Sequence, residues 1–448
     1  MLYNIIYLAA LIWMFFFLFS DDVYLDHFTP KSGKGIDIAH GLFKQIQGTE
    51  LEKNLVLVKA DGTNVNTGHL LGSIRCLEMF LGRPLQWDIC LLHLNELPLR
   101  HVFMNLDGTT KGPDKFAGPI GSELNGNVSE WKVIKFKPIP YAGFVFLDNA
   151  TIDKLSTDQY YAYRICWSVI TGEVDEDLAL LEVGPLNHSR WLTLACRILR
   201  YYVSVSKPSR NLKTIADFVV KVYFASWFQI KINKKLTDGS KNLFFLLQRI
   251  NKISQISIRE ICYQVINNNS YFAHGENILL AMVADEDEEV RRIAINKILS
   301  LKGYGATNED TEDEDFEGGI INENDDEEEE DSDENDNYPP MNKDVRFFRK
   351  LKINFKASSY YEMTPSTQWQ SIPPILQQLN YNEIQNLRLN PFSSKHECHS
   401  QNVERHIKSV TEASSAVAGH DRRDGLIRNK IRSRKLMKSF ESKRSFIF

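Results

Sequence analysis

The residues that decide the fold are Leu55–Gly68, with the sequence LVLVKADGTNVNTG. They begin with a short apolar, partly β-branched run that predicts a buried strand, and Asp61–Gly62 predicts a tight turn at its end. Residues 70–81 then have the apolar spacing of a helix, and residues 85–92 predict a second buried strand. Strand, helix and strand in so few residues indicate an α/β fold with a βαβ-type unit on a mixed sheet.

Asp61 is the first candidate for a functional residue. A carboxylate at the end of a buried strand projects from a rigid sheet edge, where it is well placed to hold a divalent cation. An ordinary Asp-Gly turn explains the same residues, and the motif taken alone favours that turn.

Two further groups of polar residues carry candidate chemistry. Cys90 and His93 form a C-x-x-H pair, but no second pair at zinc spacing accompanies them, so a closed structural zinc site is not predicted. Glu404 lies one or two turns into an expected helix over 399–417, where a solvated helix face explains a lone glutamate equally well. The chain has no GxxxxGK[ST], GxGxxG, GxSxG or HExxH motif. No motif therefore supports a nucleotide-dependent function or a common hydrolase mechanism.

Helical spacing dominates the middle of the chain. Apolar residues recur three and four positions apart through residues 156–301, which predicts a helical region of roughly 145 residues. A helix is also expected over 36–47, a strand over 345–355, and an irregular stretch that ends in a short helix over 366–390.

Charge is distributed unevenly along the 448 residues, whose formal net charge is −5. Residues 309–336 hold 18 acidic residues and no Lys or Arg, and we expect the tract 307–337 to be disordered because it has little apolar surface to bury. The rest of the chain has 53 basic and 40 acidic residues, and the tail from Asp421 is basic. This balance is what a phosphate-binding surface requires, although an ordinary solvated surface explains it too.

The six cysteines are scattered and form no CxxC pair, which indicates a reduced, intracellular chain rather than a disulfide framework. Residues 1–19 carry no charge and are almost wholly apolar, and as a helix they would nearly span a bilayer. Three interpretations stay open for them: a membrane anchor, an acquired or wrongly joined start, and a cleaved signal. The cleaved signal is the least favoured, because no basic residue precedes the run and no small-x-small site follows it.

The order of eight motifs resembles a widespread group of transposon-derived animal proteins and, more distantly, the hAT superfamily of cut-and-paste transposases. The resemblance covers about residues 24–302 and 345–444. The motifs, in chain order, are DGTNVNTG (61–68), CLLHLNELPLRHVF (90–103), LDGTT (106–110), FAGPIG (116–121), LSTDQ (155–159), HSRWLTLACRILR (188–200), YFAHGENILLAMVADE (271–286) and CHSQNVERHIKSVTEASSAV (398–417).

This resemblance implies a ribonuclease-H-like sheet that a long helical insertion splits before the last catalytic glutamate. It implies three carboxylates that bind two Mg²⁺ or Mn²⁺ ions and activate an attack on phosphodiester. Asp61 matches the second carboxylate and Glu404 the third, while Cys90 and His93 match the C-x-x-H that follows the second Asp. The Arg-Trp pair of the family's insertion corresponds to Arg190 and Trp191.

The first catalytic Asp of the family lies on an earlier strand, and the apolar segment 1–19 stands in that place here. We therefore expect an incomplete sheet without its first strands, including the central one, and vestigial roles for Asp61 and Glu404. Asp21, Asp22 and Asp26 lie in no apolar strand and are rejected as substitutes. Removal of one bridging carboxylate lowers metal affinity and rate by orders of magnitude, so an inactive protein without a bound cation is expected.

The predicted organisation is a hydrophobic segment (1–19), a sheet region (20–155), a helical insertion (156–302), an acidic linker (303–342), a return to the sheet region (343–420) and a basic tail (421–448). The favoured function is a degenerate transposase-like protein, nuclear, that binds DNA through its basic surface and tail. The alternative is a membrane-anchored interaction scaffold. An active nuclease that takes its missing carboxylate from another chain is the least favoured, and a homodimer is a further expected partner.

Overall fold

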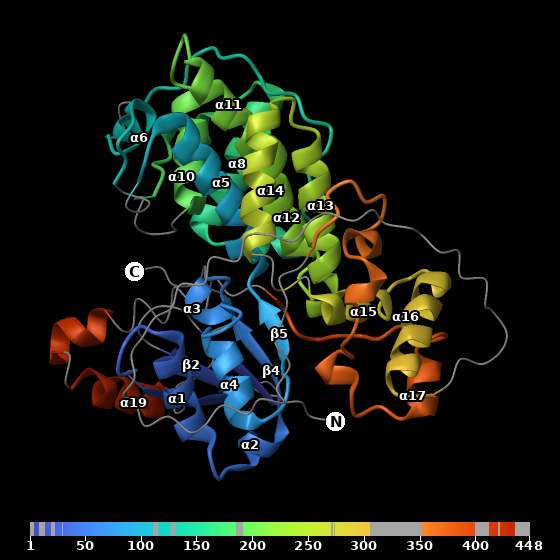
Figure 1. The fold of residues 1–448 in the computed structure, drawn as a ribbon. Coiled ribbons are helices and arrows are strands. Elements are labelled where there is room, and N and C mark those ends of the chain that lie inside the picture. The colour runs from blue at the N-terminus through green and yellow to red at the C-terminus, as the bar shows by residue number, and fades with distance from the viewer. Residues whose placement is uncertain are drawn as a thin grey trace.

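The computed structural model is mostly helical with a small parallel sheet, which agrees with the expected helix-rich α/β class. The strands lie in one part of the molecule, a large body of helices lies above them, and a group of shorter helices lies beside both (Figure 1). The described residues are 4–8, 14–18, 23–28, 30–110, 115–126, 131–184, 191–269, 272, 274–304, 352–398, 412–419 and 422–434.

The centre of the sheet is a parallel pair, β4 (Leu55–Ala60) and β5 (Gln86–Ile89). Every residue of both strands is buried, as in parallel sheets covered on both faces. On the other side of β4 lies β1 (Asn4–Leu8), also parallel, so the strand order is β1-β4-β5. The antiparallel pair β2 (Met14–Leu18) and β3 (Val23–Phe28) completes the described strands, and β2 contacts β1.

The apolar start of the chain thus contributes strands. Both β1 and β2 fall within residues 1–19, for which a membrane-spanning helix was one expectation. Within the described part of the chain, no helix is long and apolar enough to cross a membrane. The expectation that the sheet lacks its first strands is wrong, because β1 lies directly beside β4. A nearly uninterrupted apolar run has neither strand nor helix periodicity, so its sequence does not distinguish the two.

Two helices near the sheet in sequence form where the apolar spacing predicts them. Helix α1 (Gly35–Ile46) buries Ile38, Leu42 and Ile46 on one face and packs against α4 (Ser73–Leu81). The short helices α2 (Glu50–Asn54) and α3 (Asn64–Thr67) flank β4. These positions agree with the helices expected over 36–47 and 70–81.

The second strand is shorter than expected. The strand predicted over 85–92 ends at Ile89, and α5 (Leu91–Asp107) begins two residues later. Leu91 and Leu92 are buried, but they belong to the first turn of this helix rather than to the sheet. An apolar run that passes directly from strand to helix hides the boundary between them.

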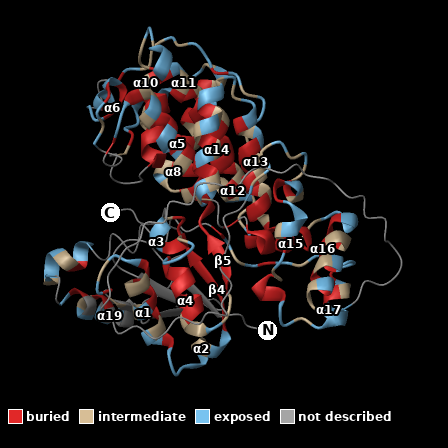
Figure 2. Ribbon diagram, in the orientation of Figure 1, coloured by how far each residue is buried: buried red, intermediate tan, exposed pale blue. Residues whose placement is uncertain are grey.

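Helices pack closely in the upper body, where α5 contacts α11, α12 and α14. Buried residues run from β4 and β5 into these helices without a break (Figure 2). The elements after α5 are α6 (Pro119–Leu124), α7 (Asn149–Asp153), α8 (Thr157–Thr171), α9 (Glu176–Leu180), α10 (Trp191–Tyr202), α11 (Arg210–Phe218), the π-helical η2 (Val219–Phe224), α12 (Ala225–Ile232), η3 (Leu236–Asp238), α13 (Gly239–Asn251) and α14 (Ile256–Asn269). Among the described residues of 156–301 no strand occurs beyond the isolated bridge Lys235–Glu397, which agrees with the expected helical region.

The third group contains α15 (Gly275–Met282), α16 (Glu288–Leu301) and α17 (Tyr381–Asn386), with short 3-10 turns η5 (Tyr360–Met363), η6 (Ser366–Gln368) and η7 (Pro374–Leu376). The irregular stretch expected over 366–390 and its short helix are confirmed.

Several other expectations fall partly or wholly outside the described residues. The acidic tract 307–337 lies outside them, and of the strand expected over 345–355 only 352–355 is described, without strand structure. Residues 412–417 of the expected helix 399–417 are helical, and the rest of it lies outside. The basic tail contributes α19 (Arg423–Arg434).

A substitution at Gly275 tests how the two chain segments of the third group are held together. A Cβ added there would lie 2.5 Å from the backbone oxygen of Gln368, so Gly275→Ala forces α15 away from that segment. We expect the free energy of unfolding to fall by about 1–3 kcal/mol, as for other overpacked sites. Gly33→Ala is the control, because nothing lies within 4 Å of the added atom. Equal denaturation midpoints for the two variants would show that this contact does not constrain the fold.

Candidate functional site at the carboxyl edge of the sheet

Asp61 follows β4 and is 3% exposed. Its Oδ1 atom accepts hydrogen bonds from the Thr63 amide (3.0 Å), the Thr63 hydroxyl (2.7 Å) and the Asn66 side-chain amide (2.9 Å). Its Oδ2 atom is buried and makes no hydrogen bond with a described residue. Oδ1 of Asp61 therefore stabilises the turn through hydrogen bonds to nearby residues, as aspartate often does in turns. Oδ2 remains available to a further ligand.

The C-x-x-H pair lies beside this turn. The Cys90 amide donates to the Ala60 carbonyl at 2.8 Å, so the end of β5 is bonded to the end of β4. A Cβ added to Gly62 would lie 3.3 Å from Cδ2 of His93, which places the half-buried imidazole against the turn. The structure thus places Cys90 and His93 beside the turn that holds Asp61, while their roles stay predictions.

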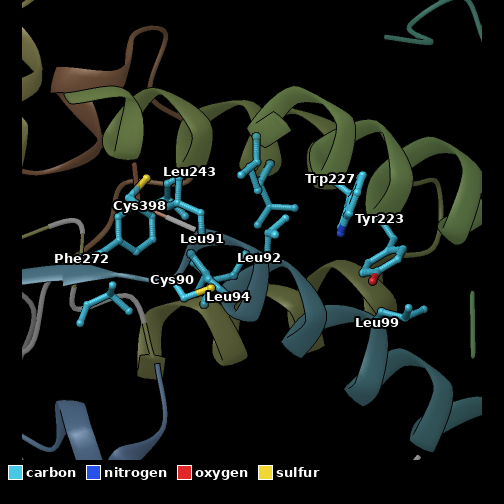
Figure 3. Packing of buried hydrophobic residues seen from close by; sticks show 14 of the residues in the cluster. Cys90, Leu91, Leu92, Leu94, Leu99, Tyr223, Trp227, Leu243, Phe272 and Cys398 are labelled. Atoms are coloured by element: carbon cyan, nitrogen blue, oxygen red, sulfur yellow. The ribbon is translucent and has the colours of Figure 1, made fainter. Parts of the chain in front are cut away.

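Two segments distant in sequence reach the same edge. The Leu91 amide donates to the Cys398 carbonyl (3.1 Å), and the Cys398 amide donates to the Lys234 carbonyl (2.7 Å). Around these bonds Leu91, Phe272, Leu243 and the Cys398 side chain pack together (Figure 3). Residues near 398 therefore return to the carboxyl ends of β4 and β5.

The remaining predicted residues are not brought to this edge by the described part of the chain. Glu404 and Arg190 both lie outside the described residues, so the predicted approach of Glu404 to Asp61 stays a prediction. Trp191 is the first residue of α10, in the helical body, and it is buried in the core. Within the described ranges no group of three or more His, Cys, Asp or Glu side chains could hold a metal ion.

A buried ion pair lies under the site. Lys59 of β4 and Asp88 of β5 are opposite each other in the register, with Nζ and Oδ2 3.2 Å apart and both side chains almost fully buried. Burial raises the pKa of Asp88, and Lys59 opposes that shift. Asp88 is therefore engaged in holding the sheet together.

Burial, with a smaller effect of Lys59, lowers the pKa of His396 to about 4, which makes this imidazole neutral at pH 7.

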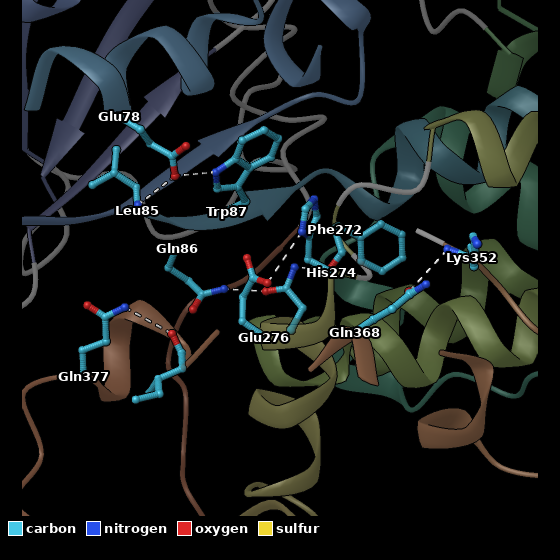
Figure 4. A network of polar contacts seen from close by, with 12 residues as sticks. Glu78, Leu85, Gln86, Trp87, Phe272, His274, Glu276, Lys352, Gln368 and Gln377 are labelled. Atoms are coloured by element: carbon cyan, nitrogen blue, oxygen red, sulfur yellow. Dashed lines mark hydrogen bonds and ion pairs between the residues drawn. The ribbon is translucent and has the colours of Figure 1, made fainter. Parts of the chain in front are cut away.

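A second polar cluster, not found from the sequence, joins α4, β5 and α15 (Figure 4). Oε1 of Glu78 accepts from the Leu85 amide and from the Trp87 indole, each at 2.9 Å, and Oε2 lies 3.6 Å from Arg75. Burial is the main reason why the pKa of Glu78 rises to about 8.

The same cluster crosses to the third group of helices. The Gln86 side chain donates to Asn277, and Nδ1 of His274 lies 3.6 Å from Glu276. Glu276 also repels the negative charge of Glu78. The hydrogen-bond partners of Glu78 are close in the chain, at Leu85 and Trp87, whereas Asn277, His274 and Glu276 come from a distant segment, so only the fold joins the two halves of this network.

Glu78 predicts a pH dependence of stability. Its folded pKa is raised, so its stabilising effect is complete below about pH 4.5 and is lost as the pH rises towards 8. Glu78→Gln keeps an oxygen acceptor and cannot ionise. Between pH 5 and 8 the free energy of unfolding should therefore fall less in this variant than in the wild type, by on the order of 1.4 kcal/mol for each pH unit. The measurement is urea unfolding at pH 5, 6.5 and 8, with the exposed Glu173→Gln as control. Parallel pH profiles for wild type and Glu78→Gln would contradict the assignment.

Comparison with known proteins assigns no family to this chain. No protein-family model, no curated protein and no solved structure matches the chain. The motif order of the sequence and the geometry of the described residues are thus the basis for any functional proposal.

Proposed function

We propose that this chain is a degenerate transposase-like protein with a ribonuclease-H-like sheet, catalytically inactive, that binds DNA non-specifically through phosphate contacts. The strand pairing supports this fold, because β1, β4 and β5 are parallel neighbours and the β2–β3 hairpin contacts β1. Helices α8 to α14 come between this sheet and the segment at Cys398, which supports an insertion between two parts of one sheet region.

The single observation that carries the inactivity is the composition of β1. In the resembled family, the first catalytic Asp lies on a strand that precedes the strand of the second. Here the strand paired with β4 is Asn4–Leu8, with the sequence NIIYL and no carboxylate. A pair of divalent ions needs bridging carboxylates to offset their repulsion, and this strand supplies none.

The other described carboxylates do not replace it. Asp88 is in the ion pair with Lys59, and Oδ1 of Asp61 already accepts three hydrogen bonds. Oδ2 of Asp61 suits one cation ligand, but the described residues offer no partner set for a two-ion Mg²⁺ or Mn²⁺ centre. The site does not fit the ions that the resemblance implies, and no catalytic step is assigned to it.

Basic side chains beside the sheet edge support DNA binding. Lys234 and the exposed Lys235 lie in the segment whose backbone bonds to residues 396–398, next to the ends of β4 and β5. Lys234 also pairs with Glu397 at the protein surface, a kind of pair that contributes little on its own and is easily exchanged. Together with the basic helix α19, these lysines provide phosphate contacts without base recognition.

The inactive state predicts that the purified full chain will not cleave or join DNA with Mg²⁺ or Mn²⁺. The measurement is cleavage of a labelled duplex in a gel, with Asp61→Asn beside the wild type. Asp61→Asn should not change the background signal, because no catalytic metal centre exists to lose. Metal-dependent cleavage by the wild type that Asp61→Asn abolishes would overturn the proposed inactivity.

Phosphate contacts predict weak duplex binding that falls steeply between about 50 and 200 mM salt, measured by fluorescence anisotropy with two unrelated sequences. The double variant Lys234→Gln/Lys235→Gln should weaken both complexes alike and reduce the salt slope by about one for each phosphate that is no longer neutralised. Its control is Lys207→Gln/Lys213→Gln, near and on α11 at the far end of the helical body (Figure 1).

Equal binding by the two double variants would exclude the sheet edge as the DNA contact. A strong preference for one of the two sequences would instead show that bases are read. Either result would contradict this part of the proposal.

A further inference from the structure

One face of helix α8 exposes an unusual amount of aromatic surface. Trp167 is 40% exposed and Tyr160 is 36% exposed, and together with Tyr163 they follow the i, i+3, i+7 spacing of a single helix face. Phe146, in the segment before α7, is 67% exposed and lies against Trp167, with ring centroids 5.3 Å apart. We call this surface, formed by Phe146, Tyr160, Tyr163 and Trp167, the α8 face.

Aromatic rings of the core support the α8 face. The Phe144 ring lies 5.0 Å from that of Trp167 and 5.2 Å from that of Phe146. Phe144 and Tyr163 in turn contact the fully buried Phe228 of α12. The exposed rings are therefore the outer layer of the core aromatic cluster, and little conformational entropy is lost when a partner contacts them.

Several carboxylates lie beyond the C-terminal end of α8. Arg164, one turn before Trp167, forms ion pairs with Asp175 (2.8 Å) and Asp177 (2.5 Å), so its positive charge is more than compensated. Glu173 and Glu176 are exposed beside these two aspartates in the chain. A partner that covers the aromatic rings thus meets a rim of carboxylates.

The Tyr160 end of the face opens into a small hollow of about 60 Å³. Its walls include Tyr160, Arg164 and Leu181, together with the carboxylates of Asp158 and Glu182. Thr193 also lines the hollow, and its hydroxyl is buried without a hydrogen-bond partner in the described part of the chain. Such a hydroxyl accepts a hydrogen bond from a long polar side chain that enters from outside.

We propose that the α8 face docks a basic segment of a partner protein, with arginine or lysine over the exposed rings and one such side chain directed into the hollow. Cations bind to the faces of Trp and Tyr rings, and Trp, Tyr and Arg dominate the energetics of protein interfaces. The acidic rim then forms ion pairs with the remaining basic residues and speeds association.

Charge disfavours the two other occupants of such a surface. Nucleic acid would bring phosphates against the carboxylates of Asp175, Glu176 and Asp177, which repel them. A second copy in a two-fold contact would place the same acidic rim against itself, with like charges facing each other. A basic protein segment is the occupant that satisfies both the rings and the rim.

The test uses the full chain and a synthetic 15-residue peptide of alternating arginine and leucine that carries a photo-crosslinking group. The acidic tract 309–336 also attracts such a peptide, so the crosslinked residues are mapped by mass spectrometry. We expect crosslinks within residues 144–182, and a peptide affinity at that site about five- to tenfold lower in Phe146→Ser, because the ring that binds the cation is removed. The charge variant Glu173→Gln/Glu176→Gln should weaken binding mainly at low salt.

Tyr304→Ser is the matched control, because Tyr304 is similarly exposed, at 41%, outside the helical body. Crosslinks confined to the acidic tract, or equal peptide affinity for Phe146→Ser and Tyr304→Ser, would overturn the proposal. Dissociation of a dimer by Phe146→Ser in sedimentation would instead assign the face to self-association, and loss of single-stranded DNA binding would assign it to nucleic acid.

Discussion

The arrangement of the molecule depends on a short chain of backbone hydrogen bonds at the carboxyl end of the sheet. Ala60 accepts from Cys90, Leu91 donates to Cys398, and Cys398 donates to Lys234. Ala60, Cys90, Leu91 and Cys398 are buried, and an unpaired amide or carbonyl there would cost about as much as a broken hydrogen bond. The bonds therefore hold the sheet, the helical body and the returning C-terminal segment in one relative position.

Buried polar groups make this junction specific as well as stable. The Lys59–Asp88 pair lies within the sheet, and the Glu78 cluster lies between the sheet and α15. The ion pair requires both partners, since a single buried charge left without its partner destabilises a protein by several kcal/mol. The Glu78 carboxyl requires its hydrogen bonds, since an unpaired buried polar group is also costly. Such groups disfavour shifted packings in which the same apolar surfaces would still be buried.

Local pattern was sufficient for most of the fold. The apolar spacing predicted α1, α4 and the helices after residue 156, and the run before Asp61 predicted β4. It failed for β1 and β2, because a continuous apolar run lacks the alternation that distinguishes a strand. At the site, the strand ends that carry Asp61 and Cys90 could be located from the sequence, while the roles of these residues stay predictions. Glu78 bonds to the nearby Leu85 and Trp87, but Glu276 comes from α15, so no local pattern indicates that the network extends there.

The distribution of charge separates two kinds of contact on one chain. Lysines gather where the segment around Lys234 meets the sheet edge, whereas carboxylates surround the aromatic face of α8. At physiological salt, charges more than about 8 Å apart are largely screened, so each surface responds to its own neighbours rather than to the net charge of the molecule. The two proposed binding surfaces use different residues and opposite charges. If both proposals hold, phosphates and a basic protein segment would not compete for the same residues, and one molecule would be able to bind both at once.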